Sequence, residues 1–352
     1  MIVAVVGVGL VGGSVGLAAR SRLGAHVRGV DPAAAVRALE RGAIDEACDE
    51  IPAALRGADA AFVAVPVDAL PAVLDAVLAA APQDCVVTDV GSAKRPVVEG
   101  REDPRFVGGH PLAGAEAAGV EHAREDLFDG ATWYLTPTRA TAGVLYERLH
   151  RMLGALGARP VALDAVAHDR IMATVSHLPH VLANVLVGQA AGALDGEALP
   201  AVGPSFRDAT RVAGANPPLW NGIYAANRDA LGEALDSAIA TLAEWRERLG
   251  AGEDLAALQE RAARERAALL EDRFGGPLVE LRAAVPNRPG VVADLALALG
   301  HAGINISDMA LAPSPDNTQG VIALWVKDRE AGRAAALVRE LGFPVSAQGG
   351  AS

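Results

Sequence analysis

The sequence predicts an α/β Rossmann-type dinucleotide-binding domain, then an all-helical domain, then a small α+β domain. A glycine-rich turn near the N-terminus joins an apolar strand to an apolar helix. Apolar runs then alternate with helix-like stretches as far as Asp164, which is typical of a mostly parallel sheet with covering helices. From Ala165 to about Arg273 the strand pattern is lost. We therefore expect domains at 1–164, 165–273 and 277–352.

The first turn has the spacing G-x-G-x-x-G. Gly7, Gly9 and Gly12 follow the strand-like "IVAVV" and precede the helix-like "SVGLAAR". Glycine permits a positive φ in the turn, and a Cβ would keep a pyrophosphate from the backbone and the helix from its strand. The helix N-terminus adds N–H donors and a positive dipole end. We expect a dinucleotide to bind along Gly7, Gly9, Leu10, Val11 and Gly12.

An acidic residue in the right place indicates which dinucleotide binds. The next strand-like run, "AHVRGVD", ends in Asp31, nineteen residues beyond Gly12. A carboxylate there accepts hydrogen bonds from both ribose hydroxyls. The following "PAAAV" has no arginine or serine beside Asp31 to hold a 2′-phosphate, so NAD is favoured over NADP. A glycine turn in an ordinary α/β fold is the alternative, and it leaves the agreement of strand, helix and acid unexplained.

The rest of the chain completes the fold prediction. Further strands are expected within 58–66, 84–94, 105–114, 131–137 and 159–164. In the helical domain, apolar residues recur at helical spacing and exceed what one small bundle can bury, which predicts a homodimer: Leu235, Ile239, Leu242, Trp245 and Leu249. After the linker "FGGP" the order is strand, helix, strand, strand, helix, strand, with Pro289 at a helix start and Gly303 at a helix end.

Composition limits the partners. The 352 residues carry 31 Lys plus Arg against 43 Asp plus Glu, a net charge of −12, which disfavours nucleic acid and anionic membranes. Cys48 and Cys85 form neither a ligand pattern nor a disulfide framework, which favours the cytoplasm. We expect no targeting signal, and no apolar run reaches the roughly 18 residues of a membrane span.

Two predicted strand ends carry reactive side chains. Ser92 follows "TDVG", and His110 stands between two glycines and a proline, which predicts a constrained loop that aims the ring. Histidine suits a general base because its pKa lies near neutral pH. Ser92 is expected to bond the same substrate oxygen or to orient the imidazole. The alternatives are a surface-loop histidine and an ordinary turn serine.

The helical domain offers further candidates. His177 and His180 share one helix face, with a kink expected at Pro179. Further ligands at metal-binding spacing do not accompany them, so no metal is expected and both are interpreted as core or supporting residues. In "SFRDATRVAGANPPLW", a helix bearing Arg211 would present a guanidinium fork to a carboxylate. Surface ion pairing is the alternative.

The ordered motifs "VGVGLVGGS", "TDVGSAK", "GGHPLAGAE", "SHLPH" and "FRDATRVA…PPLW" resemble the prephenate dehydrogenase family of tyrosine biosynthesis. The tail "VPNRPGVVADLALALGHAGINISDM" resembles an ACT domain, which senses amino acids in related proteins. The resemblance covers nearly the whole chain. It implies NAD⁺-dependent oxidative decarboxylation of prephenate to 4-hydroxyphenylpyruvate, and an aromatic amino acid, tyrosine first, as effector.

The resemblance also implies roles for individual residues. His110 takes the substrate's hydroxyl proton, Ser92 assists it, and Arg211 binds a substrate carboxylate. The other residues implied around the pocket are His180, Glu116, Trp220 at its wall, and Asp208, which would place Arg211.

Other functions are also compatible with the sequence. An arogenate dehydrogenase shares the fold, and Glu116 is a candidate neighbour for its substrate's ammonium group. A β-hydroxyacid dehydrogenase would need a catalytic lysine in the helical domain, where 165–273 contains none. An NAD-bound sensor without turnover would leave His110 and Arg211 without a role. A tail that only strengthens the dimer is the alternative to a regulatory domain.

Overall fold

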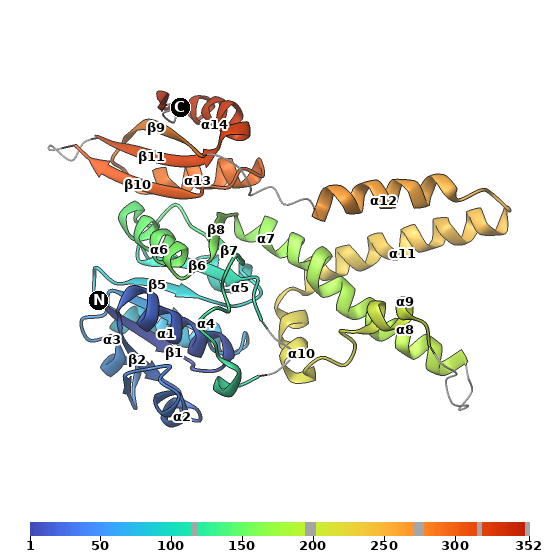
Figure 1. The fold of residues 1–352 in the computed structure, drawn as a ribbon, viewed down its shortest axis with the longest axis horizontal. Coiled ribbons are helices and arrows are strands. Elements are labelled where there is room, and N and C mark those ends of the chain that lie inside the picture. Colours follow the sequence, from blue (N-terminus) through green and yellow to red (C-terminus); the bar gives the residue numbers. More distant parts are fainter. Residues whose placement is uncertain (115–117, 194–201, 271–277, 315–318, 349–352) are drawn as a thin grey trace. The chain divides into compact units, whose positions relative to one another are not determined.

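The computed structural model describes residues 1–114, 118–193, 202–270, 278–314 and 319–348 (Figure 1). The chain forms two compact units. The first unit comprises Met1–Asp169, Asn216–Ala226 and Pro277–Ser352, and the second comprises Arg170–Ala215 and Asn227–Gly276.

The N-terminal part of the first unit is built on an eight-stranded sheet in the order β3-β2-β1-β4-β5-β6-β7-β8. Neighbouring strands are parallel except β6 and β7, which confirms the mostly parallel sheet. The strands are β1 (Ile2–Val6), β2 (His26–Val30), β3 (Glu46–Ala47), β4 (Ala60–Val63), β5 (Val86–Asp89), β6 (Phe106–Pro111), β7 (Thr132–Thr136) and β8 (Arg159–Ala162). The sequence analysis did not predict β3, which is only two residues long.

Helices connect these strands, and the strand order fixes where a ligand can lie. The helices are α1 (Leu10–Leu23), α2 (Ala35–Glu40), α3 (Ile51–Leu55), α4 (Leu70–Ala80), α5 (Arg95–Val98) and α6 (Gly143–Ala155). The order along the sheet reverses between β1 and β4. In a doubly wound sheet the ligand crevice lies at this switch point, outside the carboxyl ends of the strands.

The second unit is helical, as predicted. Its elements are the end of α7 (Ala165–Met172), from Arg170 onward, with α8 (Leu178–Ala193), α9 (Pro204–Thr210), α11 (Arg228–Gly250) and α12 (Ala256–Leu270). The start of α7 and all of α10 (Pro217–Ala226) belong to the first unit. A π-helical turn, Ala173–His177, joins α7 to α8 just before Pro179. Proline lacks the N–H of the regular hydrogen-bond ladder, so the irregular turn lies next to the residue at which a kink was expected.

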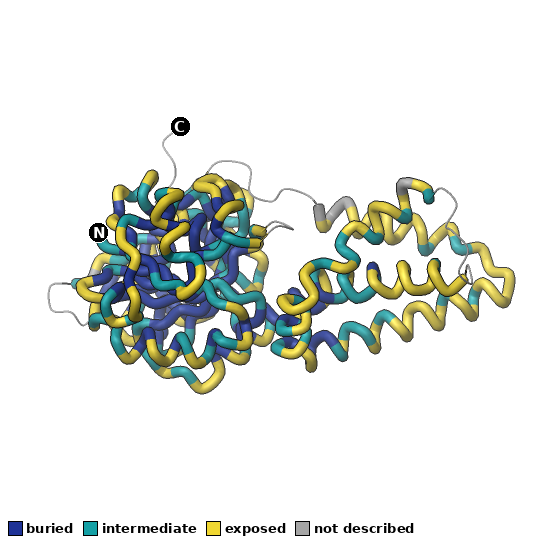
Figure 2. Tube along the Cα trace, turned by 90° about the horizontal axis from the view of Figure 1, so that it is seen from below, coloured by how far each residue is buried: buried dark blue, intermediate teal, exposed yellow. Residues whose placement is uncertain are grey.

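Much of the second unit is exposed (Figure 2), and its exposed residues include large apolar side chains. The continuous helix Ala165–Ala193 passes a length and composition test for a membrane span, which the sequence analysis did not expect, with 22% of its most apolar window buried. The core helix of a soluble protein can have the same length and composition. Exposed apolar residues on α8 and α11 are Val185, Leu186, Val187, Ile239, Leu242 and Leu249.

The C-terminal domain has a four-stranded antiparallel sheet in the order β10-β11-β9-β12. Its elements follow the predicted order: β9 (Leu278–Pro286), α13 (Val291–His301), β10 (Asp308–Pro313), β11 (Gln319–Lys327), α14 (Asp328–Glu340) and β12 (Val345–Gln348). Gly303 has a φ of 70° and ends α13 in the left-handed region, as predicted. Pro289 lies one residue before the N-cap Gly290 and so does not open the helix, contrary to the prediction.

Within the first unit, α13 packs closely against β8 and the start of α6. A Cβ on Gly300 would lie 1.8 Å from the carbonyl oxygen of Ala162, and one on Gly143 would lie 2.7 Å from the Val292 side chain. At the end of α13, His301 hydrogen-bonds the carboxylate of Asp164. The C-terminal domain is therefore docked on the sheet domain through close backbone approach.

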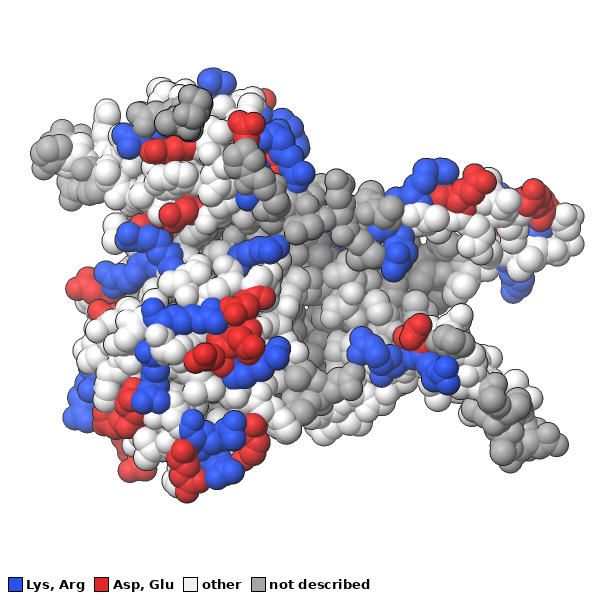
Figure 3. Space-filling model, in the orientation of Figure 1, with Lys and Arg blue, Asp and Glu red and all other residues white. Residues whose placement is uncertain are grey.

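Charged side chains are interspersed on the face that Figure 3 shows. Acidic and basic groups lie side by side over the N-terminal domain there. Ion pairs in this domain include Arg22 with Asp129 and Arg28 with Glu46.

Candidate active site and cofactor site

The glycine turn has the geometry of a phosphate-binding loop. Gly7 has a φ of +89°, and a Cβ there would lie 2.4 Å from the carbonyl oxygen of Ala64, in the loop after β4. A Cβ on Gly12 would lie 1.9 Å from the Gly7 carbonyl oxygen, whereas no atom lies within 4 Å of the position of a Cβ on Gly9. The first and third glycines therefore permit close packing, and the second faces open space. Leu10 and Val11 begin α1, whose N-terminus has no side-chain cap.

Asp31 directly follows β2 and is tied to this loop. One carboxylate oxygen accepts the backbone N–H of Val8 at 2.9 Å, and the other accepts those of Ala33 and Ala34, both at 2.9 Å. These bonds hold the carboxylate beside the glycine turn. An open position at Gly9, an uncapped helix start and a fixed acid together fit the pyrophosphate and ribose of NAD.

His110 lies within strand β6, pairs with Tyr134 of β7, and is 9% exposed. The sequence analysis placed it on a constrained loop, and this was wrong: the strand continues through His110 to Pro111. Ser92 lies, as expected, in the loop after the neighbouring strand β5, and it is half-buried. Because β5 and β6 are parallel neighbours, both side chains belong to the same carboxyl edge of the sheet.

A second histidine, which sequence reasoning missed, contacts His110. Nδ1 of His110 lies 2.9 Å from Nε2 of His168, on α7, and the rings meet edge to face. Nδ1 of His168 lies 2.7 Å from Oδ1 of Asp169. The available signal was "DAVAHD", in which a histidine and an aspartate come together one turn after a helix start. Both side chains are buried, which a periodicity count does not reveal.

Trp220 lies on α10, in the same unit as His110 and Ser92. It packs against a small buried cluster of Val67, Ala93 and Ile223, so it adjoins the residue that follows Ser92. Its ring also contacts that of Tyr224, with centroids 5.5 Å apart. This is a position from which an aromatic wall can be formed beside the Ser92 loop.

The second unit brings His180 and Arg211 together. Burial is the main cause that lowers the pKa of His180, and the charge of Arg211 lowers it further. Arg211 is exposed and is the C-cap residue of α9, so it directly follows the helix that was expected to bear it. Its backbone N–H donates to the carbonyl oxygen of Asp208 at 3.5 Å. His177 is buried, 3.2 Å from the side-chain amide of Asn227, as expected of a core residue. Glu116 lies outside the described residues.

Among the residues that the structure describes, no group of three or more histidine, cysteine, aspartate or glutamate side chains is arranged to hold a metal ion. This leaves the glycine turn and the His110 edge as the chemically distinctive part of the N-terminal domain.

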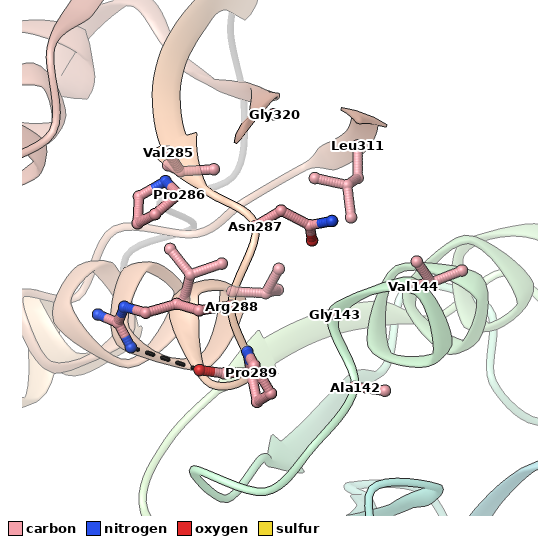
Figure 4. A pocket seen from close by; sticks show the side chains of 12 residues that line it. Ala142, Gly143, Val144, Val285, Pro286, Asn287, Arg288, Pro289, Leu311 and Gly320 are labelled. Atoms are coloured by element: carbon pink, nitrogen blue, oxygen red, sulfur yellow. Dashed lines mark hydrogen bonds between the residues drawn. The ribbon is translucent and has the colours of Figure 1, made fainter. Parts of the chain in front are cut away.

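A separate cavity lies where the C-terminal domain meets the start of α6 (Figure 4). Its lining combines the loop after β9 with the first residues of α6 and α13: Ala142, Gly143, Val144, Val285, Pro286, Asn287, Arg288, Pro289, Val291, Val292, Leu311 and Gly320. The Asn287 side chain points between Leu311 and Val144, whereas the Arg288 side chain bonds the Pro289 carbonyl oxygen and Asp294. The walls are mainly apolar, and neither α6 nor α13 has a side-chain N-cap.

A doubly wound sheet with this glycine turn, its acid and a buried histidine at the carboxyl edge defines an NAD-dependent dehydrogenase. Comparison with known proteins identifies the family. Models for the nucleotide-binding and dimerization domains of prephenate dehydrogenase match residues 15–162 and 164–260, and an ACT domain model matches 279–342. The prephenate dehydrogenase of Bacillus subtilis (strain 168) is 30% identical over 334 residues, which are 90% of each chain.

Solved structures agree. Synechocystis arogenate dehydrogenase has a TM-score of 0.69 and 30% identity, covering 77% of this chain and 100% of that one. A. aeolicus prephenate dehydrogenase, in complex with hydroxyphenyl propionate and NAD⁺, has a TM-score of 0.68 and 28% identity, covering 76% and 98%. This chain therefore belongs to the prephenate dehydrogenase family and carries a C-terminal ACT domain. The predicted family, fold class and NAD cofactor are confirmed.

Proposed function

We propose that this chain oxidises and decarboxylates prephenate to 4-hydroxyphenylpyruvate. The observation that carries the proposal is His110, a nearly buried histidine fixed by a strand at the carboxyl edge of an NAD-binding sheet. Bound NAD⁺ supplies the acceptor for a hydride. The glycines of the first turn, with Leu10 and Val11, would bind its pyrophosphate, and Asp31 would bind the ribose and select against a 2′-phosphate.

His110 is the proposed base. As the carbinol C–H electron pair leaves as hydride, His110 takes the hydroxyl proton and the ring C–O bond becomes a carbonyl. The bond to the ring carboxylate then breaks, and its electron pair enters the ring as carbon dioxide leaves. The ring becomes aromatic and the oxygen, now a phenolate, takes the proton back from His110. Aromatisation makes the sequence irreversible, so the chain has only to orient the carbinol and supply the base.

The remaining roles are proposed on the same basis. Ser92 hydrogen-bonds the substrate hydroxyl or the imidazole, and Arg211 binds a carboxylate of the substrate. His180, whose pKa is lowered mainly by burial, is proposed as a neutral pocket residue near Arg211. The other proposed pocket residues are Trp220 as an apolar wall, Asp208 as a support for Arg211, and Glu116.

Arogenate is the second candidate substrate, because the structurally similar Synechocystis enzyme is an arogenate dehydrogenase. The purified protein should be supplied with NAD⁺ and either prephenate or arogenate, with NADH absorbance recorded and the product identified. A higher kcat/KM with prephenate, yielding 4-hydroxyphenylpyruvate, is the expected result. A higher value with arogenate, or failure to oxidise either compound, would contradict the proposal.

The proposed assembly is a cytoplasmic homodimer formed through the helical domain, residues 165–273. Large apolar residues that are exposed on α8 and α11 support it, because such surface is typical of an interface. They include Ile239, Leu242 and Leu249, three members of the stripe from which the sequence predicted a dimer.

The ACT domain, residues 277–352, is proposed to bind tyrosine as an inhibitor in the cavity beside Asn287 and Val144. Two uncapped helix starts line that cavity and attract a carboxylate, while its apolar walls suit an aromatic side chain. Helix α13 begins there and ends at His301, which bonds Asp164. Asp164 accepts the N–H of Ala167 in the first turn of α7, the helix that carries His168. A ligand that shifts α13 can therefore affect the base.

A further inference from the structure

Three side chains form a continuous hydrogen-bonded chain that ends at the proposed base. His110 contacts His168 through Nδ1 and Nε2 at 2.9 Å, and His168 contacts Asp169 through Nδ1 and Oδ1 at 2.7 Å. The far end of the chain is fixed by the backbone. The N–H of Lys94 donates to Oδ1 of Asp169 at 2.7 Å, and the N–H of Arg95 donates to Oδ2 at 2.9 Å.

These contacts determine where the protons lie. Each oxygen of Asp169 already faces a backbone donor, so the carboxylate acts as an acceptor toward His168. Nδ1 of His168 must then carry its proton. In a neutral imidazole the other nitrogen has the lone pair, so Nε2 of His168 accepts a hydrogen bond and Nδ1 of His110 donates it. This leaves the lone pair of His110 on Nε2.

We infer that His168 and Asp169 are positioning residues that hold His110 in the tautomer with a basic Nε2. The inference rests on the proposed role of His110 as base, and it adds two residues that act through it. A base must present its lone pair to the substrate hydroxyl, and the wrong tautomer would present an N–H there instead. In the Ser-His-Asp triad the aspartate does the same for its histidine.

The surroundings keep His168 neutral. Its side chain is fully buried, and desolvation is the main cause that lowers its pKa, with the charge of Lys94 acting in the same direction. Asp169 and Asp89 act in the opposite direction. The Tyr134 ring packs edge to face on His168, with centroids 5.6 Å apart. A neutral His168 is required, because a protonated ring would donate from both nitrogens and could not accept from His110.

The hydrogen-bonded chain from His110 through His168 to Asp169 also explains how His110 accommodates the positive charge that it gains during the reaction. When Nε2 takes the substrate proton, Nδ1–H remains bonded to His168, so no further proton has to move. The negative charge of Asp169 lies one ring away and stabilises the imidazolium that forms. Both effects act mainly in the transition state and should therefore appear in kcat more than in KM.

The test replaces His168 and measures catalysis and the tautomer of His110 in separate experiments. His168→Phe keeps a ring against Tyr134 and removes the acceptor, so kcat should fall about 10²–10⁴-fold with KM and NAD⁺ affinity nearly unchanged. His168→Gln should recover part of this loss, because its amide can accept from His110 and donate to Asp169. His150→Phe is the matched control, since His150 is also buried but lies on α6, and its kcat should stay at the wild-type value.

Nitrogen NMR of ring-labelled histidine provides a readout that needs no substrate. The His110 signals are assigned because they are missing from the spectrum of His110→Asn. In the wild-type protein, His110 should carry a proton on Nδ1 and none on Nε2. His168→Phe should abolish that preference. A wild-type His110 protonated at Nε2, or a His168→Phe enzyme within twofold of wild-type kcat, would overturn the inference. If prephenate is not oxidised while the Nδ1-protonated form is found, the proposed function fails and the tautomer assignment stands.

Discussion

Lys94 and Asp89 form an ion pair in which both side chains are fully buried, and both hold Gly109, the residue before His110. The ammonium of Lys94 donates to the Gly109 carbonyl oxygen at 2.7 Å, and Asp89 accepts the Gly109 N–H at 3.0 Å. A Cβ on Gly109 would lie 2.5 Å from the Asp89 carbonyl oxygen, so a larger residue does not fit. The pair thereby fixes the strand that presents the proposed base.

Replacing Lys94 with methionine should destabilise the protein by about 3–5 kcal/mol, because Asp89 would be left buried without its cation. Burial lowers the pKa of the Lys94 ammonium, and the charge and hydrogen bond of Asp89 act in the opposite direction. Urea unfolding of Lys94→Met, Asp89→Asn and the double variant measures the effect. The double variant should lose less than the sum of the two single losses. Simple additivity would contradict the coupling.

Cofactor choice should depend on Asp31. The wild-type enzyme should have a higher kcat/KM with NAD⁺ than with NADP⁺, because the carboxylate would repel a 2′-phosphate. Asp31→Ser with Pro32→Arg should erode or reverse this preference by replacing the acid with a hydroxyl and a cation. Steady-state kinetics with both cofactors provides the measurement. Equal use of the two by the unaltered protein would mean that Asp31 has another role.

Replacement of His110 and replacement of Arg211 should affect different kinetic constants. His110→Asn should lower kcat by about 10²-fold or more with little change in KM, as expected for loss of a general base. Arg211→Ala should mainly raise KM, by about 10-fold or more, because a charge-assisted hydrogen bond contributes roughly 1.5–3 kcal/mol. Initial rates over a range of prephenate concentrations separate the two constants. Near-full turnover by His110→Asn would exclude it as the base.

His150, buried on α6, should make stability depend on pH. Burial lowers its pKa to about 4, although the Ile306 backbone and the charge of Asp308 act in the opposite direction. In the unfolded chain its pKa is about 6.5, so between about pH 4 and 6.5 the unfolded state binds more protons. The thermal midpoint should therefore fall as pH decreases through this window. His150→Phe should flatten this part of the profile, and an unchanged slope would assign the dependence to other groups.

The sequence predicted the fold well where local chemistry determines it. Glycine spacing, strand-helix alternation and the left-handed Gly303 all depend on residues close in the chain. The positions of His110 and of its partners could not be predicted from residues close in the chain. Only the pairing of β6 with β7 shows that His110 belongs to a strand, and only α7 brings His168 to it from 58 residues away. Burial of Lys94 and His150 likewise depends on contacts between distant segments, and a periodic pattern in the sequence cannot predict such contacts.

Filling the effector cavity should remove inhibition by tyrosine without altering catalysis. Val144 is 56% exposed at the start of α6 and lines the cavity, so Val144→Trp can occupy it without disturbing the core. The inhibition constant for tyrosine should rise about 10-fold or more, equivalent to losing about 1.4 kcal/mol of binding, while kcat and KM for prephenate stay near wild type. Leu341→Trp, an exposed site at the end of α14, serves as the control and should be inhibited normally. Point variants are preferable to removing the tail, because close packing of Gly300 on Ala162 means that truncation would uncover β8. Tyrosine inhibition that persists unchanged in Val144→Trp would place the effector elsewhere, including the active site, where it could compete as a product-like ligand.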